Sequence, residues 1–291
     1  MKTSVVATVA AVLLAGCGSI SSAAPIAVNP SATDEIANLS KTGPHAKSVV
    51  IVMMENRDYN LIIGSSQAPY INGTLVPEAA LMTNSHAIGH PSQPNYLAFF
   101  SGSTQGITDD SCPHTFSADN VGEELIAAGK TFDGYSESMP HDGYTGCSTS
   151  LYARKHNPWV NFTNVPSSSN LVYNGFVEPP PTLSIIVPNL CNDMHDCNTK
   201  TGDAWLKNNL PAILQYNQTH DGLLILTWDE AAPDTNGTNQ IATLLIGPMV
   251  KPGRYNQHVN HYSVLHTIET IARIPCTANA CQAAVLKKMW H

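Results

Sequence analysis

His90-Pro91-Ser92-Gln93-Pro94-Asn95-Tyr96 (HPSQPNY) joins an apolar segment at 82–88 to the run YLAFF at 96–100, which we expect to be an amphipathic helix. Each proline biases the residue before it away from helical dihedrals, whereas Pro94 and Asn95 suit the first positions of a helix. Ser92 should therefore lie in a constrained turn, beside the positive end of a helix dipole that favours a phosphate. An ordinary strand-to-helix loop with a capping serine fits these seven residues equally well.

Apolar runs of strand length recur along the chain and are each followed by polar residues. They lie at 48–54, 82–88, 131–136, 183–187, 223–227 and 241–246, with helix-like stretches at 121–130, 202–214 and 263–274. Pro211 could kink or divide the second helix. Nearly continuous apolar strands that alternate with helices predict a single α/β domain, with a mostly parallel central sheet and helices on both faces.

Polar side chains at the ends of these strands are the main regularity of the sequence. The carboxyl ends of parallel strands form one edge of a sheet, where ligands bind. We therefore expect these residues to converge there: Glu55, Ser92, Asp193, His195, Asp229 and Glu230. Every strand must end in something polar, but that explains poorly why four ends carry possible metal ligands. Carboxylates with imidazoles suit a divalent metal ion, whose identity and number the residues leave open.

A divalent ion at the serine oxygen would make it a nucleophile by lowering its pKa, and would offset charge on a transferring phosphoryl group. In this interpretation Ser92 attacks phosphorus, the alcohol leaves, and water later frees the phosphoserine. His90 or another nearby histidine would protonate the leaving group. The sequence has no G-x-S-x-G elbow at Ser92, no GxxxxGK[ST] loop and no HExxH pair.

The composition limits the partners of the protein. The chain has 291 residues, of which 12% are charged, and its net charge is −8. Nucleic acid is not an expected partner, because it requires a basic surface. An acidic protein that handles an anionic substrate must concentrate positive charge locally, from a metal ion or from Arg, Lys and His.

The N-terminus has the pattern of a targeting segment. A short apolar run ends in Leu14-Ala15-Gly16-Cys17, which resembles a bacterial lipobox. We expect a signal peptide over 1–17 with lipidation at Cys17, a flexible tether over 18–47 and a catalytic domain over 48–291. A simpler secretory site could lie near Ala23-Ala24. The protein would then be exported, either secreted or held at the cell envelope, with a membrane contact only through the lipid anchor.

Six cysteines remain when Cys17 is set aside, and an even number in an exported chain suggests disulfides. Local spacing favours the pairs Cys191–Cys197 and Cys276–Cys281, which leaves Cys112–Cys147. A zinc cluster is the rival interpretation, but the sequence contains no CxxC.

Several motifs together resemble a known family. They are VVIVMMENR (49–57), HPSQPNYLAFFSG (90–102), YARKHNPWVNF (152–162), IVPN and NDMHD (186–189 and 192–196), GDAWL (202–206), LLILTWDE (223–230) and HYSVLHTIE (261–269). With these motifs in this order, the chain resembles the bacterial secreted acid phosphatases and phosphatidylinositol-3-phosphate phosphatases of the phosphoesterase family. The same family also contains bacterial phospholipases C. The resemblance implies an alkaline-phosphatase-like fold, a divalent metal cofactor and a phosphoester substrate.

The resemblance also assigns roles to residues of this chain. Ser92 matches the nucleophile, and His90, Asn95 and His195 complete the expected catalytic set. The expected metal ligands are Glu55, Asn56, Ser92, Asp193, Asp229, Glu230 and His261. The expected substrate contacts are Asn95, Arg154, Lys155, His156 and Asp196, although residues 154–156 could equally be a solvated surface run. Many relatives carry further acidic residues after WDE. Here Ala231 and Ala232 follow, so Asp234 could supply a missing ligand.

These observations favour a monomeric, exported phosphomonoesterase of the acid phosphatase type, with phosphatidylinositol-3-phosphate as one candidate substrate. The first alternative is a phosphodiesterase of the phospholipase C type, since the core chemistry barely differs. The second is a binding lipoprotein that keeps the fold and lacks the reaction. Ser92, Asn95, Asp229 and Glu230 argue against this last alternative.

Overall fold

The computed structural model describes residues 44–232 and 237–291. The predicted signal peptide, Cys17, most of the tether and Asp234 lie outside these residues. Among the described residues, no helix has the length and apolar character needed to cross a membrane.

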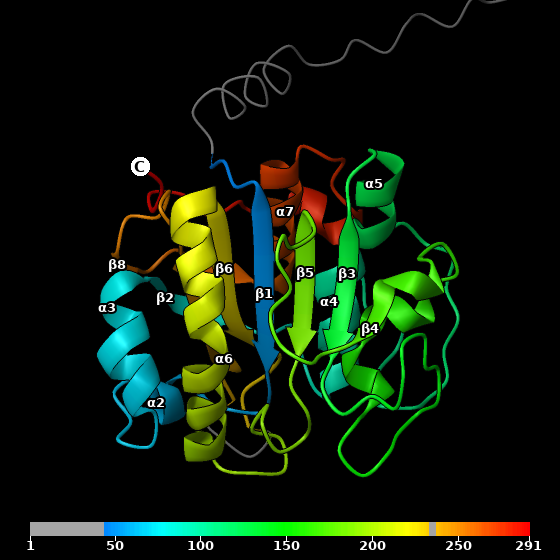
Figure 1. Cartoon of the computed structure of the whole chain (residues 1–291), viewed down its shortest axis with the longest axis horizontal. Coiled ribbons are helices and arrows are strands. Elements are labelled where there is room, and N and C mark those ends of the chain that lie inside the picture. Colours follow the sequence, from blue (N-terminus) through cyan, green and yellow to red (C-terminus); the bar gives the residue numbers. More distant parts are fainter. Residues whose placement is uncertain (1–43, 233–236) are drawn as a thin grey trace, which may run out of the picture. The chain divides into compact units, whose positions relative to one another are not determined.

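Within the described residues, the core is a sheet of nine strands in the order β4-β3-β5-β1-β6-β7-β2-β8, with β9 paired to β2. The strands are β1 (Ser48–Met54), β2 (Ala80–His86), β3 (Phe132–Ser136), β4 (Asn170–Val172), β5 (Leu183–Val187), β6 (Gly222–Trp228), β7 (Gln240–Ile246), β8 (Gly253–Tyr255) and β9 (Val259–Asn260). Strand β7 is antiparallel to both β6 and β2, and the remaining pairings are parallel. The arrowheads of β1, β3 and β5 point to one edge of the sheet (Figure 1). The predicted mostly parallel sheet is confirmed.

Side chains of the central strand alternate between two apolar cores. Val49, Ile51 and Met53 face the core formed with α4 (Ser92–Ser101), α5 (Val121–Ala127) and α7 (His261–Ala272). The other three hydrophobic residues of β1 face the core formed with α6 (Thr199–His220). Figure 1 shows α6 in front of the sheet and α4 and α7 behind it. Because β1 is buried on both faces, its sequence is a nearly continuous run of apolar residues.

Short helices fill the connections between the main elements. They are α2 (Tyr59–Ile62), η1 (Ile71–Leu75), α3 (Val76–Glu78), η2 (Arg154–His156), η3 (Pro158–Asn161), η4 (Ser167–Ser169) and η5 (Ala278–Gln282). Helix α6 is longer than predicted and runs without interruption through Pro211. The Asn198 side chain starts α6 by accepting a hydrogen bond from the Thr201 amide.

Helix α4 differs from the prediction in two respects. It begins at Ser92 rather than at Pro94, so the serine occupies the first helical position. Every residue of α4 is buried. The helix is therefore enclosed by protein all round and is not amphipathic. It lies behind the sheet (Figure 1) and shares a core with β1 side chains, and α5, α7, η2 and η3 contact it on its other sides.

The six cysteines in the part of the chain that the structure describes form three disulfide bonds, Cys112–Cys147, Cys191–Cys197 and Cys276–Cys281. This is the pairing that the spacing favours.

Candidate active site

Backbone hydrogen bonds join the loops that follow three neighbouring strands. The Glu55 amide donates to the Asp193 carbonyl at 2.8 Å, and the Asp229 amide donates to the Met54 carbonyl at 2.9 Å. These contacts hold the residues after β1, β5 and β6 at the same edge of the sheet. The convergence that the sequence predicts at the carboxyl ends of the strands is therefore present.

Four carboxyl groups lie buried at this edge: Glu55, Asp193, Asp229 and Glu230. Burial raises the pKa of Asp229 to about 7. Burial and the neighbouring charge of Asp229 raise the pKa of Glu230 to about 9. The pKa values of Glu55 and Asp193 are also raised, mainly by burial and further by nearby carboxylates. So many buried acids are costly to ionise together unless a cation offsets their charge.

Ser92 lies beside the first of these carboxyl groups. Its hydroxyl donates to Glu55 Oε2 at 3.1 Å, and the Tyr96 hydroxyl donates to Glu55 Oε1 at 2.5 Å. Ser92 and Tyr96 are one helical turn apart on α4, so both side chains lie on the same face of the helix. The serine oxygen is thus held at a helix N-terminus and against a buried carboxyl group.

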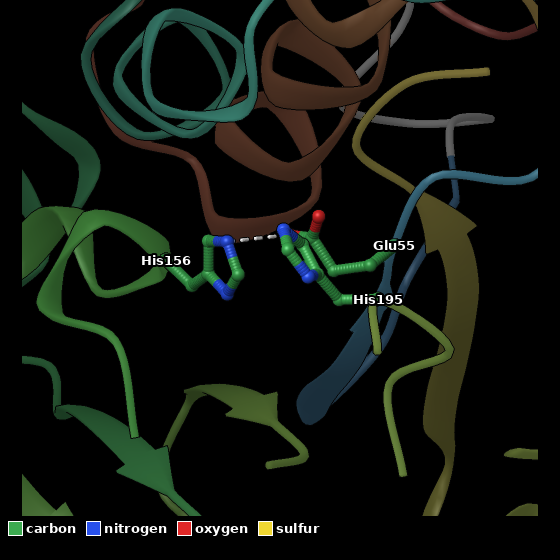
Figure 2. Close-up of side chains that lie close together, drawn as sticks. All are labelled: Glu55, His156 and His195. Atoms are coloured by element: carbon green, nitrogen blue, oxygen red, sulfur yellow. Dashed lines mark ion pairs between the residues drawn. The ribbon is translucent and has the colours of Figure 1, made fainter. Parts of the chain in front are cut away.

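Two histidines approach Glu55 from other elements. Figure 2 shows His156, from η2, and His195, from the loop after β5, directed toward Glu55 at the end of β1. One ligand atom from each of these three residues lies within 4.8 Å of the others, as in a metal site. His156 Nε2 is 3.2 Å from Glu55 Oε1, which is an ion-pair distance. Burial lowers the pKa of His156 and raises that of Glu55, so burial opposes an ion pair between the two side chains.

Several buried ligand atoms in this region lack partners. Within the described residues, no hydrogen-bond partner reaches Asn56 Oδ1, Asp193 Oδ2, Asp229 Oδ2 or His261 Nδ1. The other ring nitrogen of His261, Nε2, lies 2.6 Å from the Asp229 carbonyl. Burial lowers the pKa of His261 to about 4, so the ring is neutral, Nε2 donates its proton, and Nδ1 keeps a free lone pair. Unpaired buried oxygen and nitrogen acceptors beside four acids fit a divalent cation.

The loop before α4 is fixed by Asn95. Its Oδ1 accepts from the Ile88 and Gly89 amides at 2.9 and 3.1 Å, and its Nδ2 donates to the Gly89 carbonyl at 2.8 Å. Asn95 Nδ2 also lies 3.3 Å from Glu230 Oε2, which is 2.7 Å from His90 Nδ1. The Asn95 side chain thus fixes the backbone of the loop that precedes Ser92. The partly exposed His90 ring contacts the buried Glu230 carboxyl group.

The basic segment of η2 divides into two environments. The Arg154 guanidinium is buried, and it donates to Asn161 Oδ1 and to the carbonyls of three loop residues, Thr145, His114 and Val160. Arg154 is therefore part of the loop framework. Lys155 Nζ instead lies 3.5 Å from His195 Nε2 and 2.8 Å from Asp110 Oδ2. Burial alone would lower the pKa of Lys155, but Asp110 and Glu55 outweigh this effect and raise it, so Lys155 is a cation beside the site.

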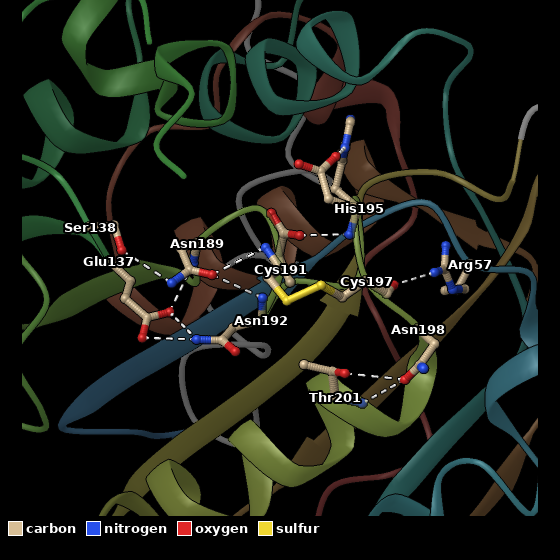
Figure 3. The surroundings of a disulfide bond; sticks show 12 residues. Arg57, Glu137, Ser138, Asn189, Cys191, Asn192, His195, Cys197, Asn198 and Thr201 are labelled. Atoms are coloured by element: carbon tan, nitrogen blue, oxygen red, sulfur yellow. Dashed lines mark hydrogen bonds and ion pairs between the residues drawn. A yellow bond between two sulfur atoms is a disulfide. The ribbon is translucent and has the colours of Figure 1, made fainter. Parts of the chain in front are cut away.

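The loop that carries Asp193 and His195 is closed by the Cys191–Cys197 disulfide (Figure 3). Asp193 Oδ1 accepts from the His195 amide at 2.7 Å, and Asp196 Oδ1 lies 2.7 Å from His195 Nδ1. The Asp196 side chain is half-exposed, so it orients His195 from the solvent side. Arg57 Nη2 donates to the Cys197 carbonyl at 2.6 Å and ties this loop to the end of β1.

A model of the Phosphoesterase family matches residues 65–275. The chain belongs to the Phosphoesterase family. A curated phosphatidylinositol-3-phosphatase from Mycobacterium tuberculosis is 44% identical over 253 residues, which are 85% of this chain and 84% of that protein. A curated probable acid phosphatase from Kluyveromyces lactis is 30% identical over 259 residues, 80% of this chain and 60% of that protein. The chain spans 56% to 61% of the four curated fungal relatives, all of which are named as acid phosphatases.

Solved structures place the Phosphoesterase chain in a wider fold group. An alkaline phosphatase superfamily protein from Vibrio parahaemolyticus has a TM-score of 0.57 at 13% identity, with 81% of this chain and 70% of that chain covered. The C-terminal periplasmic domain of EcEptC from Escherichia coli, in complex with Zn, has a TM-score of 0.53 at 11% identity, with 80% and 84% covered. At such identities the likeness concerns the fold, which is the predicted alkaline-phosphatase-like one.

Three residues of this candidate site were not predicted: Tyr96, Asp110 and Arg57. Tyr96 stands within the quoted HPSQPNY stretch, and its spacing of four from Ser92 could have placed it on the same helix face as that serine. Arg57 directly follows Glu55-Asn56. Asp110 lies in a loop, and we see no sequence signal that points to its partner Lys155.

Proposed function

We propose that this chain is a metal-dependent phosphomonoesterase whose nucleophile is Ser92. The observation that carries the proposal is the Ser92 hydroxyl, which lies at the start of α4 and 3.1 Å from Glu55 Oε2 within a cluster of buried acids. Membership in the Phosphoesterase family and the 44% identical phosphatidylinositol-3-phosphatase support the same chemistry.

The reaction that we propose has two displacements. Ser92 Oγ gives up its proton to solvent water and forms a bond to phosphorus, and the bond from phosphorus to the alcohol oxygen breaks. His90, held by Glu230 and open to solvent on its other side, protonates the departing alcohol. A water molecule then attacks phosphorus and gives a proton back to His90. The bond from phosphorus to Ser92 Oγ breaks, inorganic phosphate leaves, and Ser92 Oγ regains a proton from solvent. Lys155 and His195, whose side-chain nitrogens are 3.5 Å apart, would bind phosphate oxygens in this reaction.

A divalent cation would be held by oxygen atoms of Glu55, Asp193 and Asp229. Ring nitrogen atoms of His156, His195 and His261 would complete its ligands. It would supply Lewis-acid activation of the serine oxygen and would offset phosphoryl charge. The carboxyl groups with raised pKa values must release protons when a cation binds, so affinity should increase with pH.

The test is hydrolysis of an aryl phosphate monoester by the purified protein across pH, with and without chelator, beside Ser92→Ala. We expect turnover that depends on Ser92, is lost on chelation and returns with divalent ion. Parallel assays on phosphatidylinositol-3-phosphate and on a diester such as phosphatidylcholine distinguish a monoesterase from the phospholipase C alternative. Retained turnover in Ser92→Ala would contradict the serine mechanism, and no turnover of any phosphoester would favour the binding lipoprotein.

We also propose that the protein is exported and anchored through Cys17, as a monomer. Support comes from the lipobox-like sequence and from three disulfide bonds, which persist in oxidising compartments. Labelling of the expressed protein with a palmitate analogue should be lost in Cys17→Ala, and light scattering of the purified protein should give the monomer mass.

A further inference from the structure

Another carboxylate, Asp110, lies at the rim of the candidate active site, on the loop after α4. Asp110 Oδ1 accepts a hydrogen bond from the Gln93 amide at 3.0 Å, and Asp110 Oδ2 lies 2.8 Å from Lys155 Nζ. Gln93 is the residue after the nucleophile, and its amide belongs to the first turn of α4. The Asp110 carboxylate thus binds two groups that would suit another anion, an amide at a helix N-terminus and a lysine cation.

The position of Asp110 is set by the surrounding loops. The Cys112–Cys147 disulfide joins the loop of Asp110 to the segment that leads to η2. The Arg154 amide donates to the Cys147 carbonyl at 2.9 Å, and the Arg154 guanidinium donates to the His114 carbonyl at 3.1 Å. These bonds hold the Asp110 loop and Lys155 together from behind, so the contact between them is part of a built framework.

The charge of Asp110 is unfavourable for the expected substrate. A phosphoryl group on Ser92 Oγ would lie at the N-terminus of α4, beside the Gln93 amide and within reach of Lys155. In the structure both groups are already used by Asp110, and the negative charge of Asp110 also acts on Glu230. A phosphate that binds at Ser92 must therefore compete with this carboxylate.

We propose that Asp110 is a resident anion that a phosphate group displaces from Lys155 and from the Gln93 amide, and that it thereby limits affinity for phosphate monoesters and for the product phosphate. This proposal rests on the proposed function of Ser92. The Asp110 side chain is about one-third exposed, at 32%, so it can rotate into solvent when displaced. By weakening phosphate binding, Asp110 assists release of the product.

The experiment is calorimetric titration of the purified full-length protein with inorganic phosphate, in the presence of the activating metal ion, with KM and kcat for an aryl phosphate measured in parallel. The variants are Asp110→Asn, Asp110→Glu and the control Asp109→Asn. Asp109 is exposed and its carboxylate contacts Ser111. Thermal unfolding of each variant confirms that it is folded.

We expect the Kd for phosphate to fall about tenfold in Asp110→Asn, as for removal of one partly screened charge near the ligand. KM should fall in parallel while kcat changes by less than about threefold. Asp110→Glu keeps the charge and should keep the affinity of the wild type, as should Asp109→Asn. A Kd that is unchanged or higher in Asp110→Asn overturns the proposal, because it would mean that Asp110 only positions Lys155. Absence of phosphate binding in both the wild type and Asp110→Asn also overturns the proposal. Wild-type protein that binds phosphate without turning over a monoester contradicts the proposed function instead.

Discussion

Replacement of Tyr96 by Phe tests how the buried acids are prepared for a cation. The Tyr96 hydroxyl donates to Glu55 Oε1 at 2.5 Å, and this hydrogen bond lowers the pKa of Glu55 against the larger upward effect of burial. The Tyr96 ring also stacks on His156, with centroids 5.1 Å apart. Phenylalanine keeps the ring and its packing and removes the donor, so the substitution isolates the hydrogen bond.

The magnitude follows from the kind of bond that is lost. A hydrogen bond to a charged group contributes about 1.5–3 kcal/mol, and about 1.4 kcal/mol corresponds to a factor of ten in an equilibrium constant. A cation must bind the ionised form of Glu55, which the variant stabilises less. The Kd for the metal ion should therefore rise about 10- to 150-fold at fixed pH, which overlaps the roughly 10- to 100-fold effect typical of groups that support metal ligands.

The assay is calorimetric titration of chelator-treated protein with zinc or manganese, repeated in two buffers that differ in ionisation heat to count released protons. Tyr173→Phe is the matched control, since its hydroxyl donates to Asn209 Oδ1 at 3.1 Å, outside the acid cluster. The control should bind metal as the wild type does. Equal metal affinity in Tyr96→Phe and wild type would refute the link between this hydrogen bond and the cation site.

Three other changes have defined outcomes. Burial raises the pKa of Glu269 to about 7, so the native state holds its proton more tightly than the unfolded state and stability falls as pH rises from about 4.5 to 7. Glu269→Gln should remove this loss, raising the free energy of unfolding by up to about 3 kcal/mol at pH 8 and little at pH 4.5 in denaturant titrations; equal gains at both pH values would contradict it. Arg154→Ala should lower the free energy of unfolding by about 3 kcal/mol with little change in KM, whereas a raised KM at unchanged stability would indicate a substrate contact. Replacing Cys191 and Cys197 by Ser should lower stability by about 2 kcal/mol and weaken metal binding in the same titrations, and unchanged metal affinity would show that the bridge does not position the loop.

Much of the fold could be predicted because the information is local. Strands such as β1 and β6 are buried on both faces, so their apolar runs and the polar residues after them mark both the strands and the edge where Glu55 and Asp229 lie. The direction of β7 was not predictable in the same way. Its residues are as apolar as those of the parallel strands, and its antiparallel pairing with β6 depends on the connection between them.

The site was predictable only where its residues follow strands or the quoted motifs. Arg154 and Lys155 are adjacent and both basic. The Arg154 guanidinium donates hydrogen bonds to loop carbonyls, whereas Lys155 lies beside His195 at the edge of the cluster of buried acids. Their difference depends on how the loops around Cys147 pack. Asp110 reaches Lys155 through the same packing, which no periodicity in the sequence encodes.

The most direct test of the proposed chemistry is to trap the covalent intermediate. Metal-loaded protein is mixed with an aryl phosphate, quenched in acid during turnover, digested and analysed by mass spectrometry. The account predicts a peptide that carries one phosphoryl group on Ser92, absent from Ser92→Ala and from protein treated with chelator. Steady turnover with Ser92 unmodified, or turnover that persists in Ser92→Ala, would contradict it.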